Sequence, residues 1–153
     1  MSSVRHAEKA NNSDKDADLS PAGQARANVL AEILKNAGVI AIFTTEFKRT
    51  AQTAAPTARA LRLSSMVVPA DDSGALVERL RALKGNALVV GHGNTIPALM
   101  KMLGIETPVD IQENDYNELF VVTLGQKPQL LRLRYPSDLP ALISSDANSS
   151  RAK

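Results

Sequence analysis

The sequence of 153 residues has no cysteine, and its only histidines are His6 and His92. The lack of cysteine excludes disulfide frameworks, thiolate metal sites and cysteine nucleophiles. Two histidines are too few for a histidine-rich zinc site, which also disfavours a plain metal-dependent hydrolase. We therefore expect no metal and no other cofactor.

Aromatic residues are scarce as well, at 3% of the chain, and tryptophan is absent. A hydrophobic core must then consist mainly of Leu, Val, Ile and Ala. Nucleic-acid binding by base stacking needs exposed rings, so we expect no nucleic-acid partner. The formal net charge is only +2, and the basic residues form no polybasic run. This charge permits an anionic substrate without requiring a polyanion.

Long hydrophobic runs are also missing, so we expect no membrane partner. No signal peptide is evident, because Met1-Ser2-Ser3 leads directly into Val4. The sequence as given indicates a cytoplasmic protein, and an exported one if an upstream signal has been removed. The same short lead-in predicts that the N-terminal strand is truncated.

The hydrophobic fraction of 44% and the charged fraction of 22% are those of a globular protein, and the length suits one domain. Apolar periodicity predicts alternating helices and strands. The helices are expected over residues 21–37, 49–61, 74–84 and 95–103, and the strands over 39–44, 66–68 and 87–90. Ser20 and Ser73 are the expected N-caps of the first and third helices. Pro56 should bend the second helix or mark a restart within it.

Two later apolar runs, residues 119–124 and 130–135, predict an antiparallel hairpin. Strands that alternate with helices favour a mostly parallel sheet with helices on both faces. We therefore predict an α/β, single-domain three-layer sandwich over residues 1–143. The polar residues 144–153 are expected to form a disordered tail.

Three short motifs follow predicted strands, where open parallel sheets bind their ligands. The first holds Arg5 and His6, the second Arg49, and the third His92. Each has a structural explanation, since a histidine at a strand end is often only hydrogen-bonded and Gly91 and Gly93 are suitable turn residues. A cation such as Arg49 near a helix N-terminus opposes the helix dipole, however, and a bound anion would offset that cost.

These motifs resemble the histidine phosphatase (phosphoglycerate mutase-like) superfamily. The resemblance rests on four segments in the same order: Arg5-His6-Ala7-Glu8, Leu19-Ser20-Pro21-Ala22-Gly23-Gln24-Ala25, Arg49-Thr50 with Gln52-Thr53-Ala54, and Gly91-His92-Gly93-Asn94-Thr95. It extends from Val4 to about Tyr135. The compact size is most similar to small bacterial phosphatases, including phosphohistidine phosphatases. Ala7 replaces the glycine that is usual in the family's Arg-His-Gly motif.

The resemblance implies a metal-independent phosphatase that forms a phosphohistidine intermediate on His6. Arg5, Arg49 and His92 would bind the phosphate, because arginine forks match phosphate geometry and a protonated imidazole adds charge. The implied partner is a small phosphorylated substrate or a phosphoprotein.

A leaving alkoxide also needs a proton, which a nearby carboxylic acid would supply. Asp71 and Asp72 are the best candidates, because they follow the strand expected over residues 66–68. One of them could instead cap the next helix, although Ser73 is available for that purpose. Glu8 is a weaker candidate. If no acid is present, a phosphoramidate substrate such as phosphohistidine is favoured, because its leaving group is easier to expel.

Two other functions are also compatible with the sequence. One is a phosphoglycerate-type mutase, although such enzymes usually have insertions that this sequence lacks. The other is a non-catalytic phosphate-binding module. The complete set of Arg5, His6, Arg49 and His92 counts against that alternative.

Overall fold

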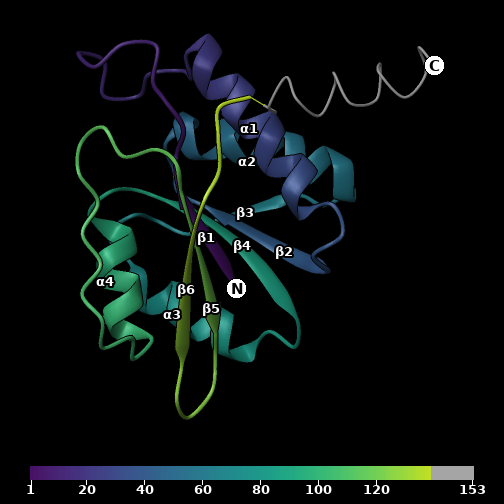
Figure 1. Ribbon diagram of the computed structural model, residues 1–153, viewed down its shortest axis with the longest axis vertical. Coiled ribbons are helices and arrows are strands. Elements are labelled where there is room, and N and C mark those ends of the chain that lie inside the picture. Colours follow the sequence, from purple (N-terminus) through teal and green to yellow (C-terminus); the bar gives the residue numbers. More distant parts are fainter. Residues whose placement is uncertain (139–153) are drawn as a thin grey trace, which may run out of the picture.

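The computed structural model describes residues 1–138, in which strands and helices alternate along the chain (Figure 1). The strands are β1 (Ser2–Arg5), β2 (Val39–Thr44), β3 (Ser65–Val67), β4 (Asn86–Gly91), β5 (Glu118–Thr123) and β6 (Gln129–Arg134). The helices are α1 (Pro21–Leu34), α2 (Lys48–Leu61), α3 (Ser73–Ala82) and α4 (Thr95–Met102). The expected tail, 144–153, lies outside the described residues.

The strands form one six-stranded sheet in the order β3-β2-β4-β1-β5-β6. The first four strands in this order are parallel, and β5 and β6 add an antiparallel hairpin. β1 lies inside the sheet, because it pairs with β4 on one side and with β5 on the other. The predicted mostly parallel sheet and the predicted hairpin are therefore confirmed.

Helices cover both faces of the sheet, which confirms the three-layer sandwich (Figure 1). Successive residues of a strand point to opposite faces, so each strand contributes to two cores. In β4, Leu88 and Val90 pack with residues of α1 such as Leu30, whereas Val89 packs with residues of α4 such as Leu99. The loops that follow the carboxyl ends of the parallel strands build the site.

The start of α1 is as predicted, with Ser20 as N-cap and Pro21 at the first helical position. The side chain of Ser20 accepts a hydrogen bond from the backbone N–H of Gly23 at 3.1 Å. A Cβ atom at position 23 would lie 2.3 Å from the carbonyl oxygen of Glu8. Gly23 therefore allows the segment after His6 to pack directly on α1.

One local prediction was wrong. Ser73 is the first residue of α3 rather than its N-cap, since Asp72 accepts the hydrogen bond from the backbone N–H of Ala75 at 3.1 Å. Serine and aspartate are almost equally good N-caps, so the composition alone does not decide between them. Of the two outcomes expected at Pro56, a bend or a restart, the restart does not occur, because α2 is one helix in which Pro56 is buried.

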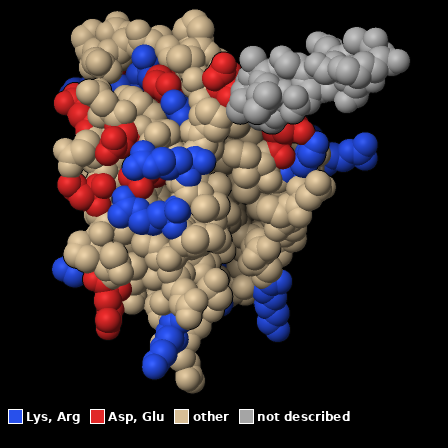
Figure 2. All heavy atoms as spheres, viewed as in Figure 1, with Lys and Arg blue, Asp and Glu red and all other residues tan. Residues whose placement is uncertain are grey.

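Acidic and basic side chains are interspersed on the face shown in Figure 2, and neither sign forms one continuous surface there. Within residues 1–138, every helix is too short or too polar to cross a bilayer.

Candidate active site

The register between β1 and β4 brings the two histidines together. Val4 pairs with Val90 and Arg5 pairs with Gly91. The backbone N–H of His6 then donates to the carbonyl oxygen of Gly91 at 2.9 Å. His6 and His92 therefore leave neighbouring strands side by side, and their ring centres are 5.4 Å apart.

His6 is almost fully buried and is held through Nδ1, which lies 2.8 Å from the carbonyl oxygen of Ala7. A carbonyl can only accept a hydrogen bond, so the proton of the neutral ring is on Nδ1 and the lone pair is on Nε2. The pKa of His6 is lowered to about 3, mainly by burial and to a smaller extent by Arg5, His92 and Arg49, whereas the hydrogen bond to Ala7 raises it. The ring is therefore neutral at pH 7.

His92 is equally buried, but it is held through the other nitrogen, because Nε2 lies 2.9 Å from Oγ1 of Thr45. Its pKa is lowered to about 4, mainly by burial and next by Arg49, whereas Glu46 raises it. The ring of Phe47 packs against the imidazole almost at a right angle, with ring centres 5.3 Å apart. His92 is thus fixed by one hydroxyl and one aromatic ring.

Buried threonines connect His92 to the start of α2 and to the segment after His6. Oγ1 of Thr45 lies 3.1 Å from Oγ1 of Thr50, which also donates to the carbonyl oxygen of Phe47 at 2.8 Å. Thr53 accepts from the backbone N–H of Ala7 at 2.9 Å and donates to the carbonyl oxygen of Arg49 at 2.7 Å. Sequence reasoning gave these threonines no such role.

Arg5 is held by backbone carbonyl oxygens of the turn 112–115. Its Nη1 donates to Gln112 at 3.1 Å, to Glu113 at 2.7 Å and to Asp115 at 3.2 Å. Its Nε is buried and has no hydrogen-bond partner within residues 1–138. A buried donor without a partner is costly, so this atom suits an anion.

Arg49 is held in a similar way, since its Nη1 donates to the carbonyl oxygen of Lys15 at 2.9 Å. Its Nε is also buried and unpaired in the described part of the chain. The first turn of α2 carries no acidic residue to offset its two cations. Oδ1 of Asp16 accepts from the backbone N–H of Lys48 at 2.8 Å and so caps α2 from a distant loop.

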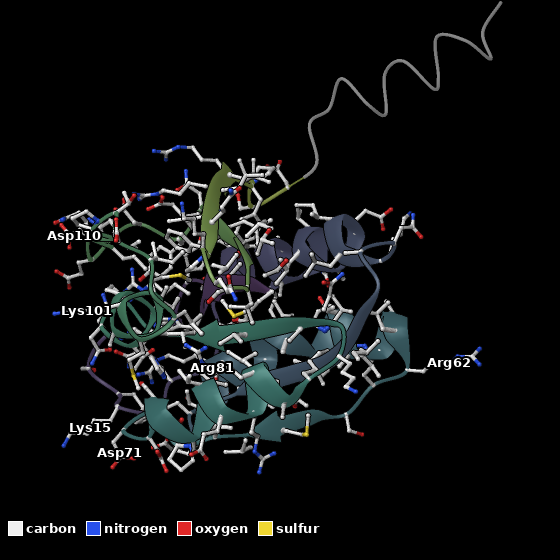
Figure 3. The ribbon with its side chains drawn as sticks, turned by 90° about the horizontal axis from the view of Figure 1, so that it is seen from below. Lys15, Arg62, Asp71, Arg81, Lys101 and Asp110 are labelled. Atoms are coloured by element: carbon white, nitrogen blue, oxygen red, sulfur yellow. The ribbon has the colours of Figure 1, made fainter. Side chains whose placement is uncertain are left out.

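The three candidate acids lie in different surroundings. Asp71 lines the same cavity as the histidines, and Figure 3 shows it on the same side of the molecule as Lys15. Asp72 caps α3 and is not among the lining residues. Glu8 is paired with Arg26, whose Nε donates to one carboxylate oxygen at 2.7 Å and whose Nη2 donates to the other at 3.2 Å.

The two histidines, the two arginines and Asp71 surround one cavity of about 540 Å³. It is lined by Arg5, His6, Lys9, Phe47, Arg49, Ala70, Asp71, His92, Gly93, Asn94 and Thr95. The structure thus brings together the predicted Arg5, His6, Arg49, Asp71 and His92, but neither Asp72 nor the weaker candidate Glu8. Sequence reasoning missed Lys9, Phe47 and the turn 112–115. Within residues 1–138, no three histidines or carboxylates are grouped so that they could hold a metal ion.

The cavity combines a neutral imidazole lone pair with two unpaired guanidinium Nε–H groups. Such donors bind a tetrahedral oxyanion, and a second imidazole that can take up a proton would add positive charge. The arrangement can therefore hold a phosphoryl group against a nitrogen nucleophile.

Several solved structures share this fold. The chain is 23% identical to the protein histidine phosphatase SixA complexed with tungstate, with a TM-score of 0.72, and the match covers 88% of this chain and 97% of that one. For mycobacterial glucosyl-3-phosphoglycerate phosphatase with inorganic phosphate, the identity is 16%, the TM-score 0.73 and the coverage 92% and 99%. No curated protein sequence matches significantly.

The family comparison agrees with these structural matches. The model of the histidine phosphatase superfamily (branch 1) matches residues 3–79, which include Arg5, His6 and Arg49. His92 lies beyond this span, directly after β4, which pairs with β1. It completes the group of histidines and arginines around the cavity. The chain belongs to the histidine phosphatase superfamily, branch 1.

Proposed function

We propose that the protein hydrolyses a phosphomonoester or a phosphoramidate through a covalent phosphohistidine intermediate on His6. The observation that carries this proposal is the hydrogen bond between Nδ1 of His6 and the carbonyl oxygen of Ala7. It leaves the lone pair of a neutral imidazole on Nε2, and the ring lines the cavity. A nitrogen lone pair of this kind is a competent nucleophile toward phosphorus.

In the first step, Nε2 of His6 forms a bond to phosphorus while the bond from phosphorus to the leaving oxygen or nitrogen breaks. The leaving atom takes the proton of the Asp71 carboxyl group. Arg5 and Arg49 donate hydrogen bonds to the phosphoryl oxygens and offset the charge that develops on them.

In the second step, water attacks phosphorus and the bond from phosphorus to Nε2 breaks. One proton of the water passes to the Asp71 carboxylate, and the phosphate departs with the new hydroxyl group. Both His6 and Asp71 thereby return to their starting states, as general acid–base catalysis requires.

His92 has a different part in this scheme. Its pKa is lowered to about 4, mainly by burial. A bound phosphoryl dianion places negative charge beside the ring and raises this pKa, because an opposite charge stabilises the imidazolium. The protonated ring then adds a third positive group to the two arginines.

The substrate class follows from the leaving group that the site can expel. The fold shared with a protein histidine phosphatase motivates phosphohistidine as the specific candidate. An imidazole leaves more readily than an alkoxide, so hydrolysis of phosphohistidine should depend less on Asp71 than hydrolysis of an alkyl phosphate.

The test measures hydrolysis of p-nitrophenyl phosphate in EDTA, and it traps the intermediate by rapid denaturation with labelled substrate. We expect activity to persist in EDTA and an acid-labile, base-stable label on the peptide that holds His6. Loss of activity in EDTA with recovery on adding zinc or magnesium would show that the proposed chemistry is wrong. A label on His92 would reverse the roles of the two histidines.

A further inference from the structure

Two aromatic rings lie over the two arginines of the cavity. The whole sequence has only three phenylalanines and two tyrosines. Cζ of Arg5 lies 4.3 Å from the ring centre of Tyr116, and Cζ of Arg49 lies 4.4 Å from the ring centre of Phe47. The face of an aromatic ring attracts a guanidinium at this distance. Each ring therefore limits the positions that its arginine can adopt.

The same two guanidinium groups are also held at one nitrogen. Nη1 of Arg5 donates to the carbonyl oxygens of the turn 112–115, and Nη1 of Arg49 donates to the carbonyl oxygen of Lys15. In both groups Nε is buried and has no partner among residues 1–138. The edge that carries Nε is therefore the one left for a ligand.

We propose that Tyr116 and Phe47 are positioning residues, which hold Arg5 and Arg49 so that the Nε edge of each guanidinium faces the phosphoryl group. The distance from Cζ to the ring centre is nearly equal in the two pairs, although the rings come from different parts of the chain. Tyr116 follows the turn that binds Nη1 of Arg5, and Phe47 immediately precedes α2. The inference deepens the proposed function, because it identifies groups that preorganise the oxyanion site of that reaction.

The turn before Tyr116 is itself fixed by two hydrogen bonds. The backbone N–H of Gln112 donates to Oδ2 of Asp115 at 3.0 Å, and the backbone N–H of Asp115 donates to the carbonyl oxygen of Gln112 at 3.0 Å. Among the described residues, Phe47 lines the cavity whereas Tyr116 does not. Tyr116 therefore acts on the anion indirectly, and because its ring centre also lies 6.1 Å from that of His6, the test must separate an effect through Arg5 from one through His6.

The test measures the affinity for inorganic phosphate by calorimetry, because binding does not require turnover. Tyr116→Leu and Tyr116→Met remove the ring, whereas Tyr116→Phe keeps it. We expect the two ring-free variants to bind phosphate about three- to tenfold more weakly, and Tyr116→Phe to stay within about twofold of the wild type. Two ring-free variants are used so that a folding defect in one does not decide the result.

A double-mutant cycle shows whether Tyr116 acts through Arg5. Lysine has no planar fork to orient, so Tyr116→Leu should have little further effect when it is combined with Arg5→Lys. Phe47→Leu should likewise lose its effect in the Arg49→Lys background. A Tyr116→Leu effect of the same size with and without Arg5→Lys would overturn the proposal, as would unchanged phosphate affinity in both ring-free variants.

Arg132→Ala is the matched control, because Cζ of Arg132 lies 5.3 Å from the ring centre of Phe120 and neither residue lines the cavity. We expect this variant to bind phosphate within about twofold of the wild type. A protein that shows the cycle but does not hydrolyse aryl phosphate would disprove the proposed function and leave the positioning roles supported. A protein that hydrolyses aryl phosphate without the coupling would do the reverse.

Discussion

The carboxyl ends of β1 and β4 each present a buried histidine to the cavity, but the two rings are held by different nitrogens. His6 is held through Nδ1 by the carbonyl oxygen of Ala7, and His92 is held through Nε2 by the hydroxyl of Thr45. Both pKa values are lowered mainly by burial, to about 3 and about 4. The pKa values therefore do not separate the two roles, whereas the hydrogen-bond partners do.

A carbonyl oxygen only accepts a hydrogen bond, and a hydroxyl group both accepts and donates. The carbonyl of Ala7 therefore commits His6 to one neutral tautomer, which is what a nucleophile needs. The hydroxyl of Thr45 can turn to suit either protonation state of His92. This ring can gain a proton when a dianion binds and lose it when phosphate leaves, without losing its anchor.

Replacing each histidine by alanine should produce the largest effects and should separate the two roles. We expect His6→Ala to reduce turnover of an aryl phosphate to the uncatalysed rate, because the covalent step is lost. His92→Ala should cost on the order of 10²–10³ in kcat, as for other preorganised charge sites, and should still yield labelled enzyme. The measurements are kcat and the stoichiometry of label after rapid denaturation. Label on the His6→Ala protein would contradict the assignment of the covalent step to His6.

Replacing Asp71 should have the next largest effect. This prediction tests whether an acid protonates the leaving group when His6 is phosphorylated. Asp71→Asn should slow alkyl phosphate hydrolysis by about 10²-fold or more, because a positioned acid typically contributes that much. Phosphohistidine hydrolysis should change much less. Asp72→Asn is the control, since its carboxylate caps α3, and it should lower thermal stability rather than kcat. Equal losses in kcat for the two variants would remove Asp71 from its assigned role.

Much of the fold was predictable from local patterns. Short β-branched runs indicated most of the strands, and Ser20-Pro21 marked the start of α1 correctly. The placement of β1 beside β4 was not predictable, because strands so far apart in sequence pair through packing that no local pattern records. That register is what places His6 against His92.

The candidate site was predictable only where the residue type itself indicates the chemistry. Histidine and arginine at strand ends indicated the cavity, because few other side chains bind phosphate there. The binding of Arg5 by the turn 112–115 was not predictable, since the acceptors are backbone carbonyls, which every residue possesses. The choice between Asp71 and Asp72 depended on which carboxylate caps α3, and both Asp72 and Ser73 are suitable caps.

Thr45→Val should have a smaller effect, and it tests the anchor that distinguishes His92. The substitution keeps the shape of the side chain and removes the hydroxyl that lies 2.9 Å from Nε2. We expect kcat to fall by about tenfold, the typical effect of losing one buried hydrogen bond, and Thr45→Ser to restore most of it.

Thr57→Val is the matched control for this prediction. Thr57 is also fully buried, but its hydroxyl has no hydrogen-bond partner among residues 1–138. Kinetic constants should therefore remain at the wild-type values in this variant. If Thr45→Val leaves kcat unchanged as well, the hydroxyl is not what prepares His92 for its role.

The smallest expected effect is on the pH dependence of stability, and it tests what the two histidines share. Unfolded histidine has a pKa near 6.5, whereas His6 and His92 have folded-state pKa values of about 3 and about 4. Above pH 6.5 both states are neutral and the stability is fully retained. As the pH falls below 6.5 the unfolded chain binds protons that the folded chain does not, so the free energy of unfolding decreases by about 1.4 kcal/mol per pH unit for each histidine.

Urea unfolding at pH 7.5, 6.0 and 5.0 should show a shallower pH dependence of stability for His6→Asn and a still shallower one for the double variant with His92→Asn. Saturating phosphate should flatten the wild-type curve in the same range, because the bound anion raises the folded-state pKa of His92. Identical slopes for the wild type and the double variant would show that these imidazoles are not held neutral at the carboxyl ends of β1 and β4.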